Sequence, residues 1–317
     1  MAVKIVLLGE CMVELFQLVE NVYHQNFAGD VYNTAVYLKR ASSDLDVQFF
    51  SAIGTDLVSD QLVAAVEAEK IGSGLLLRSK TARPGLYMIN TDCFGERSFV
   101  YWRDNSAAKQ VMQLLKAQSA VTLDCQWFYF SGISLAILSS ADRALLFALL
   151  AELKAQGCRL IFDPNYRPTL WQTNGNDISQ CREAFTQAYQ MADIALPGLD
   201  DHQVLFGAKN AQDVLTHLQQ LGVAEIVVKN GKEGVLLFAD GECHEIAAVP
   251  VKKVIDTTAA GDSFNGGYLA ARLTGASPVT AANYAAALAS FVVQHTGAIV
   301  SRENFSEFSR NCQLPTR

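Results

Sequence analysis

The sequence has no run of Lys or Arg, no long apolar segment and no two cysteines in a CxxC pair. A formal net charge of −7 without a basic cluster argues against binding to nucleic acid or to an acidic membrane surface. Between Lys4 and Gly9 the apolar run is only four residues long, too short for a signal peptide or a membrane span. We therefore expect no nucleic-acid or membrane partner, and small anionic ligands held by local positive features.

The 7 cysteines and 5 histidines are scattered along the chain. An odd number of widely spaced cysteines fits free thiols in a reducing compartment, and neither residue type has the spacing of a zinc site. We therefore expect a cytoplasmic protein.

Three common nucleotide-binding patterns are also missing. No GxxxxGK[ST] loop occurs, Gly72-Ser73-Gly74 lacks the third glycine and the following helix of a dinucleotide site, and the HRD and DFG sequences of protein kinases are absent. A nucleotide must be held in another way.

The 317 residues, half of them hydrophobic, alternate between short apolar runs and segments of helical spacing. The apolar, β-rich runs are Val3–Leu8, Val47–Ile53, Phe128–Ile133, Arg159–Phe162, Ile194–Leu196 and Glu225–Val228. This alternation predicts one α/β domain, residues 1–317, with a doubly wound, mainly parallel sheet flanked by helices. Polar residues follow several of these runs, so we expect ligands at the carboxyl edge of the sheet.

Residues 83–105 break this pattern. Leu86–Asn90 and Ser98–Arg103 are strand-like and are joined by the turn-rich link Asp92–Glu96. Together with Met12–Val22 they predict a small sheet that closes over the rim of the main one. This lid subdomain would be built from residues of about 11–32 and 83–105.

The most informative segment runs from Asp256 to Tyr268. From Thr258 to Gly261 no side chain is bulky, so backbone N–H groups can turn toward an anion where the next helix is predicted to begin. Asp262 would lie beside that anion, where a carboxylate is repelled as a phosphate ligand but can accept a proton from an attacking hydroxyl. The alternative is an ordinary N-capped helix whose glycines allow close packing.

The run Asp-Thr-Thr-Ala-Ala-Gly-Asp, followed closely by Gly-Gly, resembles the C-terminal signature of the PfkB, or ribokinase-like, carbohydrate kinases. The resemblance implies a ribokinase-like fold, ATP with Mg²⁺ as phosphoryl donor, and a lid that commonly mediates dimerisation, hence a homo-oligomer. It also implies that Asp262 is the catalytic base and that the backbone of Ala260, Gly261 and Asp262 forms an anion hole.

The segment Lys229-Asn230-Gly231-Lys232-Glu233-Gly234 ends an apolar run in a tight turn. Alone it reads equally well as a hairpin turn, whereas the resemblance places it beside the nucleotide phosphates. Asn283–Ser290 resembles the segment that flanks adenine, although helix packing explains its alanines as well. The residues that we expect at ATP are Asn165, Lys229, Gly231, Gly234, Ala259, Gly261 and Asn283.

Family members often bind a monovalent cation near the anion hole, with ligands from the signature loop and from a Gly-x-x-x-Ser stretch. The spacing of Gly297 and Ser301 fits this stretch, so the resemblance makes Asp256, Thr258, Gly297 and Ser301 candidate ligands for K⁺. Mg²⁺ needs fewer protein ligands, because water and phosphate oxygens supply most of its coordination.

Gly29, Asp30 and Asn33 stand just before a helical pattern that runs to Arg40. Their polar groups suit sugar hydroxyls and the glycine allows close backbone approach, whereas an N-cap cluster is the alternative. The stretch resembles the family's N-terminal sugar-binding signature, but Asp30 and Val31 depart from its commoner small residues. That departure puts ribose and fructose in doubt as substrates.

Tyr101 and Arg103 are two residues apart on a predicted strand and so share a face, which Tyr87 on the partner strand can join. Arg167 follows another strand end. Two arginines with tyrosine hydroxyls alongside suit a carboxylate, which neutral sugars lack, so we expect an acidic sugar. Surface arginines with core-facing tyrosines are the alternative.

Further motifs extend the resemblance over nearly the whole chain. Gly9-Glu10-Cys11-Met12-Val13-Glu14, Tyr101-Trp102-Arg103 and Asn165-Tyr166-Arg167-Pro168 resemble the branch of the family that phosphorylates 2-keto-3-deoxygluconate. That resemblance implies contacts of this sugar acid with Gly29, Asn33, Tyr87, Tyr101, Arg103 and Arg167, to which we add Asp30 and Asp262. A fructokinase or another neutral-sugar kinase is one alternative, and a non-catalytic sugar-acid sensor on the same fold is another.

Overall fold

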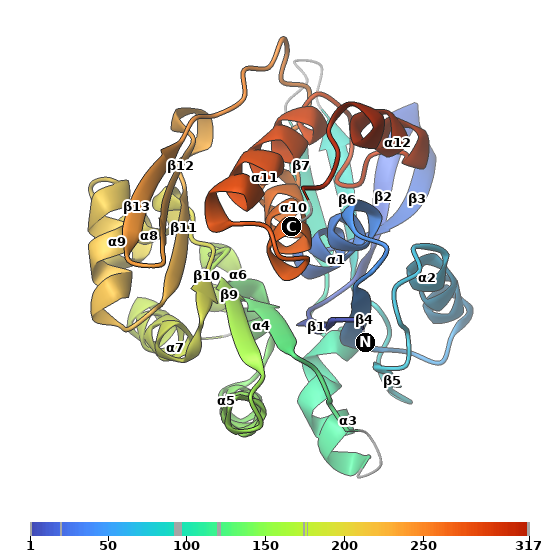
Figure 1. Ribbon diagram of the computed structural model, residues 1–317. Coiled ribbons are helices and arrows are strands. Elements are labelled where there is room, and N and C mark those ends of the chain that lie inside the picture. Colours follow the sequence, from blue (N-terminus) through green and yellow to red (C-terminus); the bar gives the residue numbers. More distant parts are fainter. Residues whose placement is uncertain are drawn as a thin grey trace.

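The computed structural model describes residues 2–315 except 20, 92–96, 119–121, 174 and 176. The predicted link Asp92–Glu96 therefore lies outside the described residues. Two sheets organise the chain, a large one of nine strands and a small one of four (Figure 1).

The large sheet has the strand order β13-β12-β11-β10-β9-β8-β1-β4-β5. Its pairs from β5 to β11 are parallel, and β12 and β13 add an antiparallel edge. The predicted parallel sheet is confirmed; the antiparallel edge was not foreseen. The strands are β1 (Lys4–Leu8), β4 (Asp46–Ile53), β5 (Leu76–Arg78), β8 (Trp127–Ser131), β9 (Arg159–Asp163), β10 (Ile194–Ala195), β11 (Glu225–Lys229), β12 (Val235–Ala239) and β13 (Glu242–Ile246).

Two apolar cores lie on opposite faces of this sheet. Strand β1 shows why: its side chains alternate, so that Ile5 and Leu7 enter one core while Val6 and Leu8 enter the other. The first core includes residues of α1 (Asp30–Ala41), α2 (Leu57–Ala68), α10 (Ala260–Leu273), α11 (Pro278–Val292) and α12 (Arg302–Asn311). The second includes residues of α3 (Val111–Ala117), α4 (Gly132–Ile137), α5 (Ser140–Ala155), α6 (Pro168–Thr173), α7 (Ile178–Met191), α8 (Leu199–Phe206), α9 (Ala211–Gln220) and the 3₁₀ turn η1 (Ala107–Gln110). None of the helices described here is long and apolar enough to cross a membrane.

The small sheet has the order β3-β2-β6-β7, with β2 (Met12–Val19), β3 (Val22–Ala28), β6 (Leu86–Thr91) and β7 (Arg97–Trp102). Strands β6 and β7 form the predicted hairpin, in which Tyr87 lies opposite Tyr101. Strand β3 was not predicted as a separate strand, and it pairs antiparallel with β2. The four strands fall within the residue ranges expected for the lid.

Two local expectations were wrong. Ile133 was expected to end a strand, but it belongs to α4, because the Ser131 side chain accepts from the Ser134 N–H and caps a new helix. Asp30 and Asn33 were placed before a helix, but they lie in the first turns of α1. The residue before that helix, Gly29, has to be a glycine, because a Cβ there would stand 2.2 Å from the carbonyl oxygen of Glu10.

Candidate active site

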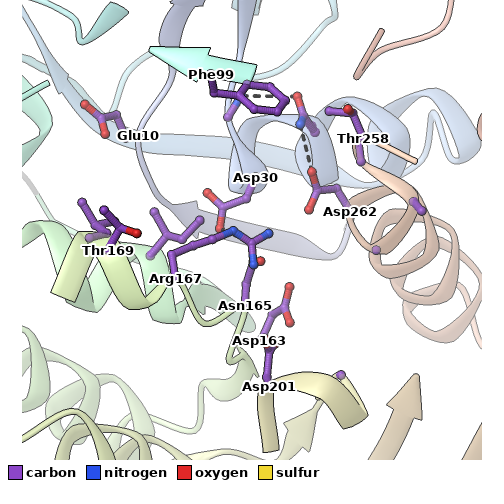
Figure 2. Close-up of a pocket in the computed structure, with 18 of the residues that line it drawn as sticks. Glu10, Asp30, Phe99, Asp163, Asn165, Arg167, Thr169, Asp201, Thr258 and Asp262 are labelled. Carbon is purple, nitrogen blue, oxygen red and sulfur yellow. Dashed lines mark hydrogen bonds between the residues drawn. The ribbon is translucent and has the colours of Figure 1, made fainter. Parts of the chain in front are cut away.

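A cavity of about 1000 Å³ opens at the carboxyl edge of the large sheet. It is lined by residues that directly follow or end β1, β9 and β11, and by side chains of the small sheet (Figure 2). The structure brings together at this cavity the predicted residues Gly29, Asp30, Asn33, Tyr87, Tyr101, Arg103, Asn165, Arg167, Lys229, Gly231, Thr258, Ala259, Ala260, Gly261 and Asp262.

One wall of the cavity is the start of α10. Ala259 has a left-handed backbone with φ of 60°, which turns the chain sharply into the helix without a side-chain cap. Ala260, Gly261 and Asp262 then form the first turn and all line the cavity. Because the first N–H groups of a helix lack intrahelical acceptors, this turn presents donors and a positive dipole end to an anion.

Asp262 is the central titratable group of this wall. Its Oδ2 accepts a hydrogen bond of 2.9 Å from Nδ2 of Asn33, in α1. Burial, followed by the charges of Asp30 and Asp163, raises the pKa of Asp262 to about 8, against the lowering effects of Asn33 and Lys229. A carboxylate with so high a pKa is a far stronger proton acceptor than an ordinary aspartate.

Lys229, at the end of β11, points inward toward α10. Its Nζ lies 3.3 Å from Oδ1 of Asp163 and 3.1 Å from Oδ1 of Asn265. A Cβ added to Gly261 would stand 3.7 Å from the same Nζ, so the ammonium lies beside the first turn of α10. Asp163 could be expected at the ligand-binding edge because it directly follows a predicted strand, but neither its pairing with Lys229 nor the part of Asn265 was predicted.

Asp30 and Asn165 meet near the centre of the cavity, where Nδ2 of Asn165 donates to Oδ2 of Asp30 at 3.1 Å. Burial is the main cause of the raised pKa of Asp30. Figure 2 shows Arg167 directed into the cavity, with Asp30 on one side of its guanidinium and Asn165 on the other. Arg167 is exposed, and its Nη1 donates to the carbonyl oxygen of Tyr166 at 2.9 Å.

The small sheet contributes an aromatic wall and a second arginine. The rings of Tyr87 and Tyr101 lie 5.7 Å apart, and the guanidinium of Arg103 stands 6.0 Å from the Tyr101 ring. Arg103 donates to the buried carboxylate of Glu10, and the Tyr87 hydroxyl donates to that of Glu14. Both glutamates belong to the motif Gly9-Glu10-Cys11-Met12-Val13-Glu14, and no individual role was predicted for either of them.

Comparison with known proteins decides the family. The profile of the pfkB family carbohydrate kinases matches residues 2–304. The chain belongs to this family. The 2-dehydro-3-deoxygluconokinase of Escherichia coli strain K12 is 43% identical over 312 residues, which are 96% of this chain and 99% of the relative. That of Dickeya dadantii strain 3937 is 41% identical over 310 residues, 95% of this chain and 97% of the relative.

A solved structure of a PfkB protein from Polaromonas sp. JS666 has a TM-score of 0.81 and 26% sequence identity. The alignment covers 98% of this chain and 99% of that protein. The predicted family and the ribokinase-like fold are thus confirmed. The segment Asp256–Tyr268, which resembles the family signature, forms the loop before α10 and the first turns of that helix.

Five predicted site residues are not among those that line the cavity. Gly234 has φ of 92°, and a Cβ there would clash at 2.1 Å with the carbonyl oxygen of Ile246. Asn283 donates to the carbonyl oxygen of Val279 within its own helix. Their predicted contacts with ATP stay predictions. The other three belong to the proposed cation site and are Asp256, Gly297 and Ser301.

In that cation site, Asp256 joins two loops by accepting from the N–H groups of Thr258 and Gly297, at 3.0 and 2.6 Å. Ser301 caps α12 by accepting from the N–H of Asn304 at 3.1 Å. Within the described residues no three His, Cys, Asp or Glu side chains are grouped as metal ligands. Binding of K⁺ at these loops stays a prediction.

Asp201 is another acidic residue of the cavity for which no role was predicted from the sequence. Asp201 lies in the first turn of α8, and burial with the charge of Asp163 raises its pKa to about 6. Its place at the cavity wall makes it a candidate to face a cation or the nucleotide.

Asp262→Asn should stabilise the fold above neutral pH. A carboxyl whose pKa is raised from 3.8 to about 8 favours the folded state at low pH, and this contribution is lost as the pH rises through the folded pKa. The stability advantage of the variant should therefore grow by about 1 kcal/mol per pH unit between pH 5 and 8. Denaturant unfolding measured at several pH values checks this, with the exposed Asp44→Asn as control. A difference independent of pH would contradict the raised pKa.

Proposed function

We propose that this PfkB kinase transfers the γ-phosphoryl group of ATP to the terminal hydroxyl of 2-keto-3-deoxy-D-gluconate, also called 2-dehydro-3-deoxygluconate, and so forms the 6-phosphate. The carrying observation is the buried carboxyl of Asp262 at the start of α10, beside a cavity that holds two arginines. Identity of 43% over 96% of the chain to a 2-dehydro-3-deoxygluconokinase supports the choice of substrate.

Asp262 accepts the proton of the attacking hydroxyl. Its pKa of about 8 is close to the working pH, which is the range in which a general base is most effective. Asn33 fixes the direction of the carboxylate through its 2.9 Å hydrogen bond. The N–H groups of Ala260–Asp262 then stabilise the charge on the transferred phosphoryl group, with the ammonium of Lys229 alongside.

The carboxylate of the sugar acid is recognised by arginine. Arg167 extends into the cavity and can form two parallel hydrogen bonds with a carboxylate (Figure 2). Arg103 already pairs with Glu10, so its charge is partly compensated before the substrate binds. Tyr101, half-exposed on the same wall, adds a hydroxyl and a ring face for the carbon chain.

Mg²⁺ is expected with ATP, and the cavity fits it. Mg²⁺ prefers carboxylate and water oxygens and keeps several waters, so one or two protein carboxylates suffice. The carboxylate of Asp201 would hold it, and the ion would neutralise charge on the nucleotide phosphates when bound. We add K⁺ at the loops that Asp256 joins, where a cation would stiffen the turn that leads into α10.

The small sheet is proposed as the lid and as the interface of a homodimer. It carries exposed apolar side chains at Val19 and Val22, which pair between β2 and β3, and at Val100 and Trp102 on the edge strand β7. Closure over the cavity would exclude water and so limit ATP hydrolysis. We place the reaction in the cytoplasm, where ATP is supplied; the six described cysteines are free thiols, as a reducing compartment requires.

An ADP-release assay with Mg-ATP and K⁺ should show selective turnover of 2-keto-3-deoxygluconate. The panel also contains its galactonate epimer, gluconate, fructose and ribose. Preference for a neutral sugar would keep the role of Asp262 and overturn the acid recognition. Binding without turnover of any compound would point to a sensor.

Asp262→Asn should lower turnover by roughly two to four powers of ten while ATP and the sugar acid still bind. The amide keeps the size of the carboxyl but cannot accept the proton. Single-turnover kinetics and calorimetric titration separate the two effects. Turnover near that of the unmodified enzyme would remove Asp262 as the base.

Arg167→Ala should lower kcat/KM for the sugar acid by an amount that corresponds to about 1.5–3 kcal/mol of binding energy, the value of a hydrogen bond to a charged group. It should affect a neutral sugar much less, and Arg167→Lys, which keeps only the charge, should give an intermediate loss. Arg167→Ala is a cleaner probe than Arg103→Ala, which also leaves Glu10 unpaired. Arg83→Ala, at an exposed arginine, is the control. Equal losses on both substrates would refute the carboxylate contact.

A further inference from the structure

Three side chains from three elements form a closed buried network behind the first turn of α10. Asp163 ends β9, Lys229 ends β11 and Asn265 lies in the second turn of α10. Asp163 lies 3.3 Å from Lys229 Nζ and accepts from Asn265 Nδ2 at 2.8 Å, while Lys229 donates to Asn265 Oδ1 at 3.1 Å. Tyr129 completes the network, because its hydroxyl donates to Asp163 and accepts from Asn265 at 3.3 and 3.1 Å.

The amide of Asn265 fits this place in one orientation. Its NH₂ group faces the carboxylate of Asp163 and its carbonyl oxygen faces the ammonium of Lys229, so both ends are satisfied. Asn265 is fully buried and does not line the cavity. Asp163 lines the cavity but is only 3% exposed, and its two oxygens face Lys229, Asn265 and Tyr129. The role of Asn265 must therefore pass through Lys229 or be purely structural, and the carboxylate of Asp163 is engaged by the same ammonium.

Lys229 and Asp163 are the members of the network that line the cavity, and of these two only the ammonium of Lys229 can donate to an anion. An ammonium group has three N–H bonds, and Asp163 and Asn265 account for two of them. The Nζ lies 3.7 Å from where a Cβ of Gly261 would stand, at the turn that forms the anion hole. The third N–H is thus available to an acceptor held at that turn.

We propose that Asp163 and Asn265 are positioning residues that hold the ammonium of Lys229 against the Gly261 turn, so that its remaining N–H donates to the phosphoryl group in transfer. A lysine side chain is long and loses considerable rotamer freedom when it is fixed. The network removes that cost before the substrate arrives, which is how a preorganised donor favours the transition state over the ground state. The inference rests on the proposed kinase function.

The charged members of the network also lie close enough to Asp262, the proposed base, to change its pKa. The titratable and charged groups that face Asp262 are Asp30 from α1, Asp163 from β9, Lys229 from β11, and the phenols of Tyr37 and Tyr129. Asp163 raises the pKa of Asp262 and Lys229 lowers it. Asp163→Asn and Lys229→Met should therefore move the acidic limb of the kcat/KM profile in opposite directions.

The decisive experiment is a double-mutant cycle of Asn265→Leu with Lys229→Met. Lys229→Met should lower kcat about 10²–10³-fold, as does loss of a preorganised donor. Asn265→Leu should lower kcat about 10-fold or more with KM for the sugar within about threefold, because misplacement costs turnover rather than binding. The double variant should be no slower than Lys229→Met alone.

Tyr268→Phe is the matched control. It removes another buried hydrogen bond of α10, to Glu225 at 2.6 Å, and should change stability but not kcat.

Each contrary result has a clear meaning. Losses that add in the double variant would show that Asn265 acts independently of Lys229, and would overturn the proposal. So would a loss for Asn265→Leu that appears only in melting temperature, or pH limbs that shift together in Asp163→Asn and Lys229→Met. The cycle is run on whichever sugar the unmodified enzyme phosphorylates. An error in the proposed substrate is therefore detected by the ADP-release assay and does not affect the double-mutant cycle.

Discussion

Charge balance inside one cavity governs the chemistry of this protein. Seven acidic and four basic residues line the cavity, although the ligands of a sugar-acid kinase are themselves anions. Two of the basic side chains pair with buried carboxylates, Arg103 with Glu10 and Lys229 with Asp163. Burial, with the charge of Asp163 as a further cause, raises the pKa values of Asp30, Asp201 and Asp262, and Asp30 adds to the effect on Asp262. The same burial and charge repulsion that cost stability make Asp262 basic enough to take a proton from a hydroxyl.

The close packing of α1 and α10 puts the two halves of the site together. A Cβ on Gly266 would stand 2.7 Å from Cβ of Tyr37 and 2.8 Å from the carbonyl oxygen of Thr34. Only glycine permits this approach, and it brings Asn33 to the carboxylate of Asp262 and Thr34 to its carbonyl oxygen. Gly266 serves helix packing, as the alternative interpretation of the signature expected, whereas Gly261 faces the cavity, where anion binding stays a prediction.

Sequence periodicity predicted the sheet and the hairpin because buried strands and helices leave distinct apolar repeats. It missed β3, whose residues are mostly exposed and so lack such a repeat. The signature pointed to Asp262, but the contacts around it join residues far apart in the chain. Asn33, which donates to Asp262, is 229 residues away, and Lys229 pairs with Asp163, 66 residues earlier in the chain. A single sequence carries no record of such pairs. Glu10 and Asp163 could be expected at the ligand-binding edge because they follow or end strands, but their pairing with Arg103 and Lys229, and the part of Asn265, emerged only from the fold.

Charge compensation also determines which arginine can discriminate between substrates. Arg103 is held by Glu10, and a substrate carboxylate that approaches it meets a pair whose net charge is close to zero. A neutral hydroxyl would therefore satisfy Arg103 almost as well as an anion would. Arg167 is exposed and extends into the cavity between Asp30 and Asn165, so its attraction for an anion is less compensated (Figure 2). We therefore propose that selectivity for an acidic sugar depends mainly on Arg167, while the pair of Arg103 and Glu10 ties the small sheet to the residues that follow β1.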